Sequence, residues 1–283
     1  MHSGQTIFTR DGTKLWINCF TPDEDNGKVL VIAPAAGILH EFYYLFATYF
    51  CQKGFTVISF DYRGIGKSAP PKLVGYEATL HEWAAQDVNA VLLYVKQNFN
   101  SHEIIYIGHS ISGEIIGLAP ASQYINKLVL VSSALTCEKL WPWYRRVSMK
   151  YKKFKGRTVS RLLGFVPGNK FRQRIPRGVF TQMANWCDNP NGLFDAYPDN
   201  NYRKINKPVL AYTFADDWMC PPKAVKQLLN HFSNACITWH HIEPKEIGMK
   251  EVGHYDFFYP NMKSVLWDSL LKWLNKDDRH KPC

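Results

Sequence analysis

The sequence predicts an α/β fold: a doubly wound, mostly parallel sheet with helices on both faces and a helical segment inserted into the chain. Three observations support this prediction. Short β-branched runs alternate with longer helical patterns, which is typical of a sheet built from β/α units. The runs "KVLVIA", "EIIYIG" and "KLVLVS" are apolar without a break, as in strands buried on both faces. The alternation stops between residues 135 and 207, where we expect the insertion.

The expected strands are short, β-branched runs bounded by turn residues. They cover Leu15–Phe20, Val29–Ala33, Thr56–Phe60, Ile104–Ile107, Leu128–Val131, Val209–Thr213 and Ile237–Ile242. Longer segments with helical periodicity lie between them and after them. These cover Glu41–Lys53, Trp83–Asn98, Gly113–Tyr124, Lys223–Phe232 and Ser264–Asn275. One sheet covered by helices on both faces accommodates this order.

Two parts of the chain form the expected sheet domain, and a third is inserted between them. Residues 1–134 and 208–283 carry the β/α pattern, whereas residues 135–207 contain the basic, aromatic-rich run "WPWYRRVSMKYKKFKGR". We interpret the inserted residues as a helical cap, or lid, on top of the sheet. Its aromatic residues Trp141, Trp143 and Tyr144 are the candidate substrate-binding or lid residues.

The inserted segment also concentrates the positive charge of the chain. The net charge is +10, and thirteen Lys and Arg with no Asp or Glu lie between Lys139 and Arg177. Such a run fits a solvated surface, attraction to an anionic membrane surface, or selection of anionic acyl substrates. Nucleic acid is not expected as a partner, because no recognition fold accompanies the charge. The oligomeric state is left open.

Length, hydrophobicity and cysteine usage bound the class of protein further. The 283 residues are 46% hydrophobic, enough for a sizeable core. No apolar run reaches the roughly 18 residues of a membrane span, and the first residues lack the features of a signal peptide. Seven scattered cysteines form no CxxC motif and no metal-ligand spacing. We therefore expect reduced thiols and neither a metal nor a cofactor. We also expect a cytoplasmic location, at the periphery of a membrane if the basic segment binds lipid.

The stretch "YIGHSISGEIIG" contains the expected nucleophile. Ser110 directly follows an apolar strand and precedes a helix, flanked by small residues, as on a sharp strand-to-helix turn that exposes a serine hydroxyl. Ser112 is a rival on paper, and a serine can also act there as a helix cap. A serine on the first helical turn points along the helix flank, so we prefer Ser110.

The expected base and acid follow later in the chain. His254, in "KEVGHYDFFY", lies in a loop after the last strand, and Gly253 before it leaves room for the ring. Asp216 and Asp217 follow the strand Val209–Thr213, at the edge where open parallel sheets bind ligands. One of the two carboxylates could instead belong to a solvated turn. The order Ser, Asp, His is that of one class of serine hydrolase.

With these residues in view, nearly the whole chain resembles the α/β-hydrolase superfamily. Four regions carry the resemblance: "DYRGIGKS", "GHSISG", "ADDWMCPP" and "VGHYDFF". In the family's acid loop the aspartate lies four residues before a proline, and counting back from Pro221 selects Asp217 over Asp216. The combination is similar to uncharacterised bacterial predicted α/β hydrolases and to monoglyceride-lipase-like serine esterases.

The resemblance also implies the oxyanion hole, the group of N–H donors that stabilises a tetrahedral intermediate. "PAAG" at residues 34–37 aligns with the "HGAG" of the monoglyceride-lipase-like pattern, and Tyr43 aligns with its tyrosine. The implied donors are the backbone N–H groups of Ala36 and Ile111, each worth about 3 kcal/mol in the transition state. The His-Gly of that pattern is missing here, but backbone donors need no particular side chain.

The resemblance implies the fold and the triad of Ser110, His254 and Asp217, but not the substrate. The leading hypothesis is a serine hydrolase that cleaves a carboxylic ester or thioester through an acyl-enzyme. Two alternatives stay open: an acyltransferase that uses the same residues, and a catalytically silent member of the fold that acts as a binding module. Dehalogenases and epoxide hydrolases of this fold use an aspartate nucleophile, which Ser110 argues against. The acyl chain and the leaving group are left open.

Overall fold

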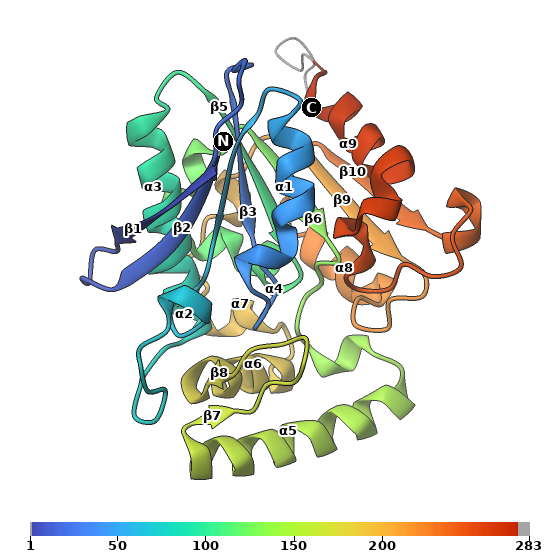
Figure 1. Cartoon of the computed structure of the whole chain (residues 1–283). Coiled ribbons are helices and arrows are strands. Elements are labelled where there is room, and N and C mark those ends of the chain that lie inside the picture. Colours follow the sequence, from blue (N-terminus) through green and yellow to red (C-terminus); the bar gives the residue numbers. More distant parts are fainter. Residues whose placement is uncertain (1, 277–283) are drawn as a thin grey trace.

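A central eight-stranded sheet organises the molecule, which we describe from a computed structural model for residues 2–276. Its strand order is β1-β2-β4-β3-β5-β6-β9-β10 (Figure 1). The strands are β1 (His2–Phe8), β2 (Lys14–Phe20), β3 (Lys28–Ala33), β4 (Thr56–Phe60), β5 (Glu103–His109), β6 (Lys127–Val131), β9 (Val209–Phe214) and β10 (Ile237–Ile242). Only the β1–β2 and β2–β4 pairs are antiparallel, and the other five pairs are parallel. The expected α/β class with a mostly parallel sheet is confirmed.

Helices cover both faces of this sheet. They are α1 (Tyr44–Cys51), α2 (Leu80–Glu82), α3 (Asn89–Asn98), α4 (Ile111–Glu114), α5 (Trp143–Leu163), α6 (Arg177–Asp188), α7 (Leu193–Ala196), α8 (Pro222–Leu229) and α9 (Asp268–Leu274). Residues of α1 and α9, such as Phe46 and Leu270, share one buried cluster with the sheet. Residues of α3 and α8, such as Val91 and Leu228, belong to the cluster on the opposite face. Successive side chains along a strand point to opposite faces of the sheet, so they belong alternately to the two clusters.

Most expected elements are confirmed, and two differences have physical causes. The edge strand β1 was not expected, because "HSGQTIF" is polar and all its residues but Ile7 are exposed. The expected helix Gly113–Tyr124 is wrong: α4 ends at Glu114, and 3₁₀ turns follow. Ala119 is extended because it precedes Pro120, which disfavours helical geometry.

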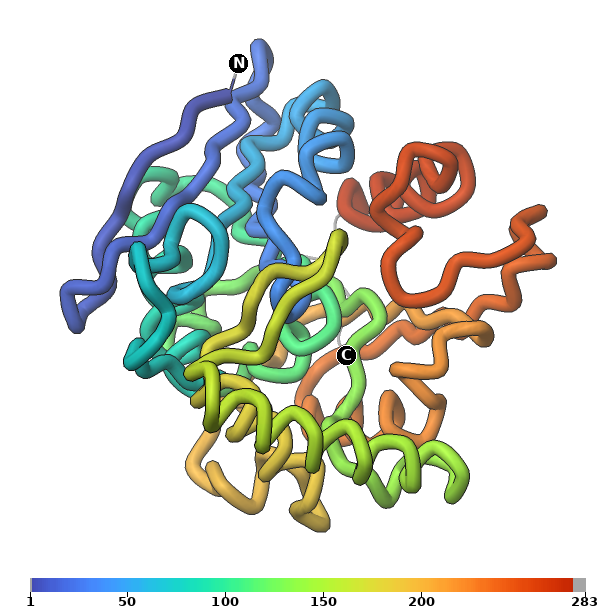
Figure 2. The backbone as a smooth tube through the Cα atoms, turned by 60° about the horizontal axis from the view of Figure 1, so that its bottom comes forward, coloured from blue at the N-terminus to red at the C-terminus, as the bar shows by residue number. Residues whose placement is uncertain are grey.

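The inserted segment, residues 135–207, lies between β6 and β9 in the chain. It contains α5, α6, α7 and a two-stranded hairpin, β7 (Phe165–Val166) with β8 (Ile175–Pro176). In Figure 1 these elements lie below the carboxyl ends of the parallel strands, with α5 as the outermost element. Figure 2 brings the hairpin and α5 in front of that edge of the sheet. The segment therefore lies over the edge of the sheet that carries Ser110, while its action as a lid stays a prediction.

The cysteines differ in part from expectation. Cys19, Cys51, Cys137, Cys187 and Cys220 are free thiols, but Cys236 takes part in a disulfide bond, so the expectation that all thiols are reduced is wrong. Within residues 2–276, no helix has both the length and the hydrophobicity to cross a membrane. The cytoplasmic location stays a prediction.

Candidate active site

Ser110 lies on a tight turn between β5 and α4. Its backbone has φ 58° and ψ −121°, a strained conformation for any residue except glycine. The turn brings the two elements so close that a Cβ on Gly108 would lie 2.7 Å from the backbone of Gly113. The small residues noticed in the sequence are therefore a steric requirement of the turn, which lifts the Ser110 side chain out of the sheet edge.

The rival Ser112 is engaged elsewhere. It is fully buried, lies 2.7 Å from the Tyr62 hydroxyl through its Oγ, and donates a hydrogen bond to the Pro34 carbonyl. Its hydroxyl thus holds the loop after β3 against the turn. Ser110, in contrast, lines a cavity at the strand ends.

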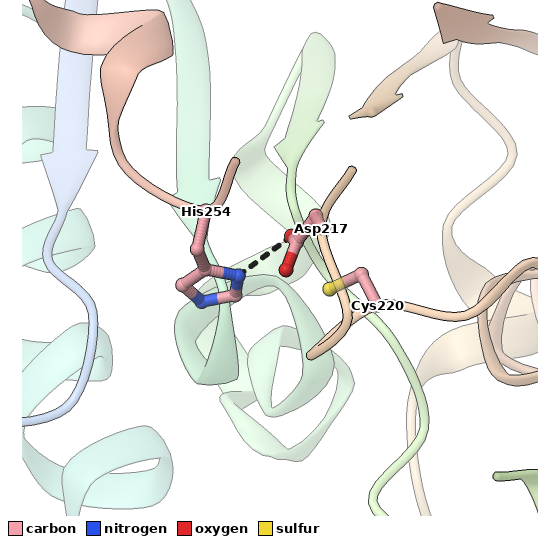
Figure 3. Close-up of side chains that lie close together, drawn as sticks. All are labelled: Asp217, Cys220 and His254. Carbon is pink, nitrogen blue, oxygen red and sulfur yellow. Dashed lines mark hydrogen bonds and ion pairs between the residues drawn. The ribbon is translucent and has the colours of Figure 1, made fainter. Parts of the chain in front are cut away.

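His254 connects Ser110 to Asp217. The Nε2 atom of His254 lies 2.8 Å from Ser110 Oγ, and its Nδ1 atom lies 2.7 Å from Asp217 Oδ2. Figure 3 shows the contact between the imidazole and the carboxylate, with Cys220 beside them. Each of these two atom pairs is within hydrogen-bond distance. The Ser110 hydroxyl can therefore donate to Nε2 of a neutral imidazole, while Nδ1–H of the same ring donates to the Asp217 carboxylate. The structure thus brings together three residues that are far apart in the chain.

The neighbouring carboxylate has a different task. Asp216 Oδ2 accepts hydrogen bonds from the backbone N–H groups of Val252 and Gly253 at 2.8 and 3.0 Å. Those residues directly precede His254, and Gly253 has φ +56°, the left-handed region that favours glycine. Asp216 therefore anchors the loop that carries the histidine, while Asp217 contacts the ring itself. Asp217 Oδ1 in turn accepts from the Met219 N–H at 2.9 Å.

A buried tyrosine and histidine connect two loops of the site. The Tyr43 hydroxyl accepts a hydrogen bond from the Ala35 N–H at 2.9 Å and lies 2.7 Å from His109 Nδ1. His109 Nε2 lies 2.8 Å from the His254 carbonyl oxygen. Burial lowers the pKa of His109 well below its ordinary value, so its neutral ring can accept from Tyr43 and donate to that carbonyl. The sequence indicated Tyr43 only through the resemblance, and no role was predicted for His109.

The backbone N–H groups of Ile111 and Ala36 are the candidate donors to an oxyanion. Ile111 is the first residue of α4, and the N–H of a first helical residue has no acceptor within its own helix. Ala35 donates its N–H to Tyr43, which leaves the next N–H in the loop, that of Ala36. Both Ala36 and Ile111 line the same cavity as Ser110. This agrees with the donor pair implied by the resemblance, whose function stays a prediction.

The cavity has a volume of about 320 Å³ and lies between the strand ends and the inserted segment, in the size range of small-molecule sites. Trp141 contributes to its wall, and its indole N–H donates to the Trp218 carbonyl at 3.1 Å. Trp143 and Tyr144 are exposed and do not line it. Their expected role as substrate or lid residues stays a prediction.

A buried glutamate in the wall was not predicted. Glu114, at the end of α4, is fully buried, and its two oxygens accept from the Thr136 N–H at 2.7 Å and the Thr136 hydroxyl at 2.6 Å. Burial raises the pKa of Glu114 to about 8, although both hydrogen bonds to Thr136 act in the opposite direction. The only sequence signal was an acidic residue within the apolar run "ISGEIIGL".

Positively charged side chains also reach the cavity. Arg172 and Lys152 line it together with Lys153. Lys153 forms ion pairs with Glu138 and Asp188, whereas Arg172 donates to the Tyr255 hydroxyl at 2.5 Å. Within residues 2–276, no carboxylate pairs with Arg172 or Lys152. Nothing in the sequence distinguished Arg172 from its twelve basic neighbours.

Within residues 2–276, two groups of side chains have the composition of a metal site: His40, Glu41 and Asp61, and a group at Ser110. The ligand atoms of Asp217, Cys220 and His254 lie within 4.8 Å of one another. Burial raises the pKa of the Cys220 thiol well above its ordinary value, and that thiol donates to the Ser132 carbonyl. Metals bind the thiolate rather than the thiol, so these residues fit a hydrogen-bonded carboxylate–imidazole pair better than a metal centre. The absence of a metal stays a prediction.

An open sheet of this strand order, with a serine on the turn after β5 and its aspartate and histidine after later strands, defines a class of α/β proteins. The family described as "alpha/beta hydrolase fold" matches residues 29–259, and the chain belongs to this family. No curated protein sequence matches at a significant level.

Solved structures of similar shape agree with the family. The esterase EaEST from Exiguobacterium antarcticum has a TM-score of 0.65 at 18% identity, covering 97% of this chain and 100% of that chain. A carboxyl esterase from Bacillus coagulans in complex with glycerol has a TM-score of 0.67 at 13% identity, covering 97% and 98%. The α/β hydrolase GrgF from a Penicillium species has a TM-score of 0.58 at 18% identity, covering 95% and 96%. At these identities the similarity establishes the fold alone.

Proposed function

We propose that the protein is a serine hydrolase that cleaves a carboxylic ester or thioester through an acyl-enzyme intermediate. The observation that carries the proposal is the hydrogen-bonded chain from Ser110 through His254 to Asp217, which opens into a cavity at a strained turn. The esterases among the structures of similar shape are consistent with it. A non-catalytic binding module would not need all three residues in contact.

The first half of the reaction follows from these positions. Ser110 Oγ attacks the carbonyl carbon of the substrate while His254 Nε2 takes the hydroxyl proton. The carbonyl oxygen becomes an oxyanion and accepts hydrogen bonds from the Ala36 and Ile111 N–H groups. Asp217 stabilises the imidazolium that forms. The tetrahedral intermediate then expels the alcohol or thiol, which takes its proton from His254, and Ser110 carries the acyl group.

The second half regenerates the enzyme. A water molecule loses a proton to His254 and attacks the acyl carbon, and the resulting intermediate expels Ser110, which recovers the proton. The products are a carboxylic acid and free enzyme. If an alcohol or amine replaces water in this step, the same residues perform acyl transfer.

The test is covalent labelling of the full chain with a fluorophosphonate probe. We expect the probe to modify Ser110, and Ser110→Ala to abolish labelling and to lower turnover of p-nitrophenyl esters by at least about 10³-fold. Ser112→Ala is the control, because it removes the rival hydroxyl and keeps Ser110. Labelling that survives in folded Ser110→Ala protein would contradict the assignment. If Ser110 is labelled, turnover of p-nitrophenyl esters of graded acyl chain length and of an acyl-CoA would define the substrate class.

A further inference from the structure

Helix α5 has one face packed against the protein and one face without a protein partner within residues 2–276. Its buried residues are Lys153 and Ser160, and a Cβ at Gly156 would collide with the Phe180 ring of α6. The opposite face is the outer surface of the inserted segment, and Figure 1 shows α5 at the edge of the molecule beyond α6. The helix is 21 residues long, so this face is an extended surface.

Large hydrophobic side chains form a stripe along this outer face. Trp143, Val147, Tyr151, Phe154 and Leu162 are 64 to 80% exposed, and the exposed Tyr144 borders them. Their spacing of three, four or eight residues places them on one side of a helix with 3.6 residues per turn. On the same helical geometry Ser160 and Lys153 fall on the opposite side. Single exposed apolar residues are common, but a continuous stripe indicates an interaction surface.

The basic residues on the two faces of α5 differ in whether a carboxylate pairs with them. On the inner side, Lys153 and Arg157 pair with Asp188, and Lys153 also pairs with Glu138. The basic residues Arg145, Lys150, Lys152, Lys155 and Arg161 are exposed. Within residues 2–276, Lys150 alone among these five lies within ion-pair distance of a carboxylate, 3.9 Å from Glu138. Arg145 and Lys152 lie over the Trp218 ring, so the cations that border the apolar stripe are Lys150, Lys155 and Arg161. Within residues 2–276, no carboxylate pairs with Lys155 or Arg161.

We propose that the outer face of α5 docks the protein on an anionic lipid surface. The helix would lie in the plane of the membrane interface, with Trp143, Tyr151 and Phe154 among the headgroups and acyl chains and the lysines and arginines against lipid phosphates and carboxylates. An apolar stripe with aromatic residues and a cationic border is the pattern of an interfacial helix. The proposal does not rest on the proposed function, since docking needs no chemistry at Ser110.

Charge complementarity favours lipid over a second copy of the chain. A two-fold interface would set the same helix against itself, and α5 contains no acidic residue. The exposed Lys150, Lys155 and Arg161 would then lie close to their copies across a desolvated surface. An anionic bilayer instead supplies the opposite charge and an apolar phase together. Docking would also set against the lipid the helix whose inner side contributes Met149 and Lys152 to the cavity wall.

The experiment is co-sedimentation of the full-length protein with vesicles. One set contains phosphatidylcholine alone and the other contains phosphatidylcholine with phosphatidylserine, each at low and at high salt. We expect binding to the anionic set at low salt, with about five-fold of affinity per contacting basic residue, and a steep decrease at high salt. Binding equal on both sets, or no binding, would overturn the proposal.

Matched variants locate the binding surface. Lys150→Glu with Lys155→Glu should lower affinity for anionic vesicles by more than tenfold, whereas Lys14→Glu with Lys96→Glu changes the net charge equally on exposed residues of β2 and α3 and should have a much smaller effect. Thermal melting verifies that each variant folds. Equal losses in the two pairs would contradict docking through α5.

A second pair of variants tests the apolar stripe and the competing occupant. Trp143→Ser with Phe154→Ser should weaken vesicle binding at least tenfold, and Phe8→Ser, at an exposed position of β1, should not. Size-exclusion chromatography without lipid completes the test. A dimer that the Trp143→Ser, Phe154→Ser variant dissociates would assign the face to a second copy and overturn the lipid proposal.

Discussion

At the scale of single residues, the two adjacent aspartates after β9 show how position decides role. Asp217 contacts the His254 ring at 2.7 Å, whereas Asp216 accepts from two backbone N–H groups just before that histidine. Both carboxylates orient the same imidazole, one directly and one through the loop. The consequences of losing each charge should therefore differ.

We expect Asp217→Asn to lower kcat for a p-nitrophenyl ester by about 10⁴-fold, because the amide favours the wrong tautomer of His254. Asp216→Asn keeps an oxygen for the loop N–H groups and loses only the charge of the acceptor, so we expect a loss of less than about tenfold. Steady-state kinetics of the two folded variants measures both effects. A larger loss for Asp216→Asn would make Asp216 the catalytic acid.

At the scale of elements, the contact between β5 and α4 sets the geometry of the nucleophile. The two elements approach through Gly108 and Gly113, and the backbone of Ser110 takes up the strain of the reversal. The turn is held by hydrogen bonds from the Ser110 N–H to the Val131 carbonyl and from the Gly113 N–H to the Ser110 carbonyl. An added side chain at Gly108 would collide with backbone atoms, which cannot move aside as a flexible side chain could.

We expect Gly108→Ala to destabilise the protein by about 1–3 kcal/mol, the usual cost of overpacking, and to reduce labelling of Ser110 because the turn must shift. Gly248→Ala is the matched control: its φ is +70° and no atom lies within 4 Å of an added Cβ, so only the strain of about 1–2 kcal/mol applies, with full labelling. Denaturant unfolding and probe labelling give both quantities. A Gly108→Ala protein as stable and as reactive as the wild type would contradict the steric account.

At the scale of the whole molecule, the sheet separates two buried clusters, and the cavity lies where the inserted segment meets one of them. Several residues of the cavity wall, including Ile111, Trp141 and Ile175, belong to the cluster that also contains the core of α3 and α8. The wall is thus part of the folded core. A titratable group buried in this wall should therefore affect the stability of the entire fold.

Glu114 is that group, and its ionisation should make the free energy of unfolding depend on pH. Its pKa is about 8 in the folded protein against an ordinary value of 4.5, so the folded state holds a proton that the unfolded state releases. This contribution is fully present below about pH 4.5, decreases by up to about 1.4 kcal/mol per pH unit above it, and is lost above about pH 8. Stability from this group therefore falls as pH rises.

Glu114→Gln imitates the protonated side chain and should flatten this dependence. We expect the Tm of the wild type to fall more between about pH 5 and about pH 9 than the Tm of Glu114→Gln. The exposed Glu24→Gln is the control and should follow the wild type. Parallel curves for wild type and Glu114→Gln would show that Glu114 is ionised in the folded protein.

Local patterns in the sequence were enough to predict the sheet apart from β1, and to predict Ser110 and His254 of the hydrogen-bonded chain. Buried parallel strands require unbroken apolar runs, and a tight turn requires small residues beside Ser110, so both leave a signal within a few residues. The order of Ser110, Asp217 and His254 along the chain followed from the order of strands in one sheet. Only the resemblance to the family's acid loop, through the count back from Pro221, separated Asp217 from Asp216.

The tertiary structure decided what depends on contacts between distant segments. β1 is a strand because it pairs with β2, although its own residues are polar, and 3₁₀ turns replace the expected helix after Glu114. Glu114, His109 and Arg172 gained their positions from partners far away in the sequence. Trp143 and Tyr144 point outward because the other face of α5 packs on α6. The sequence alone could not predict this, because an amphipathic pattern of aromatic residues and lysines does not indicate which face the protein buries.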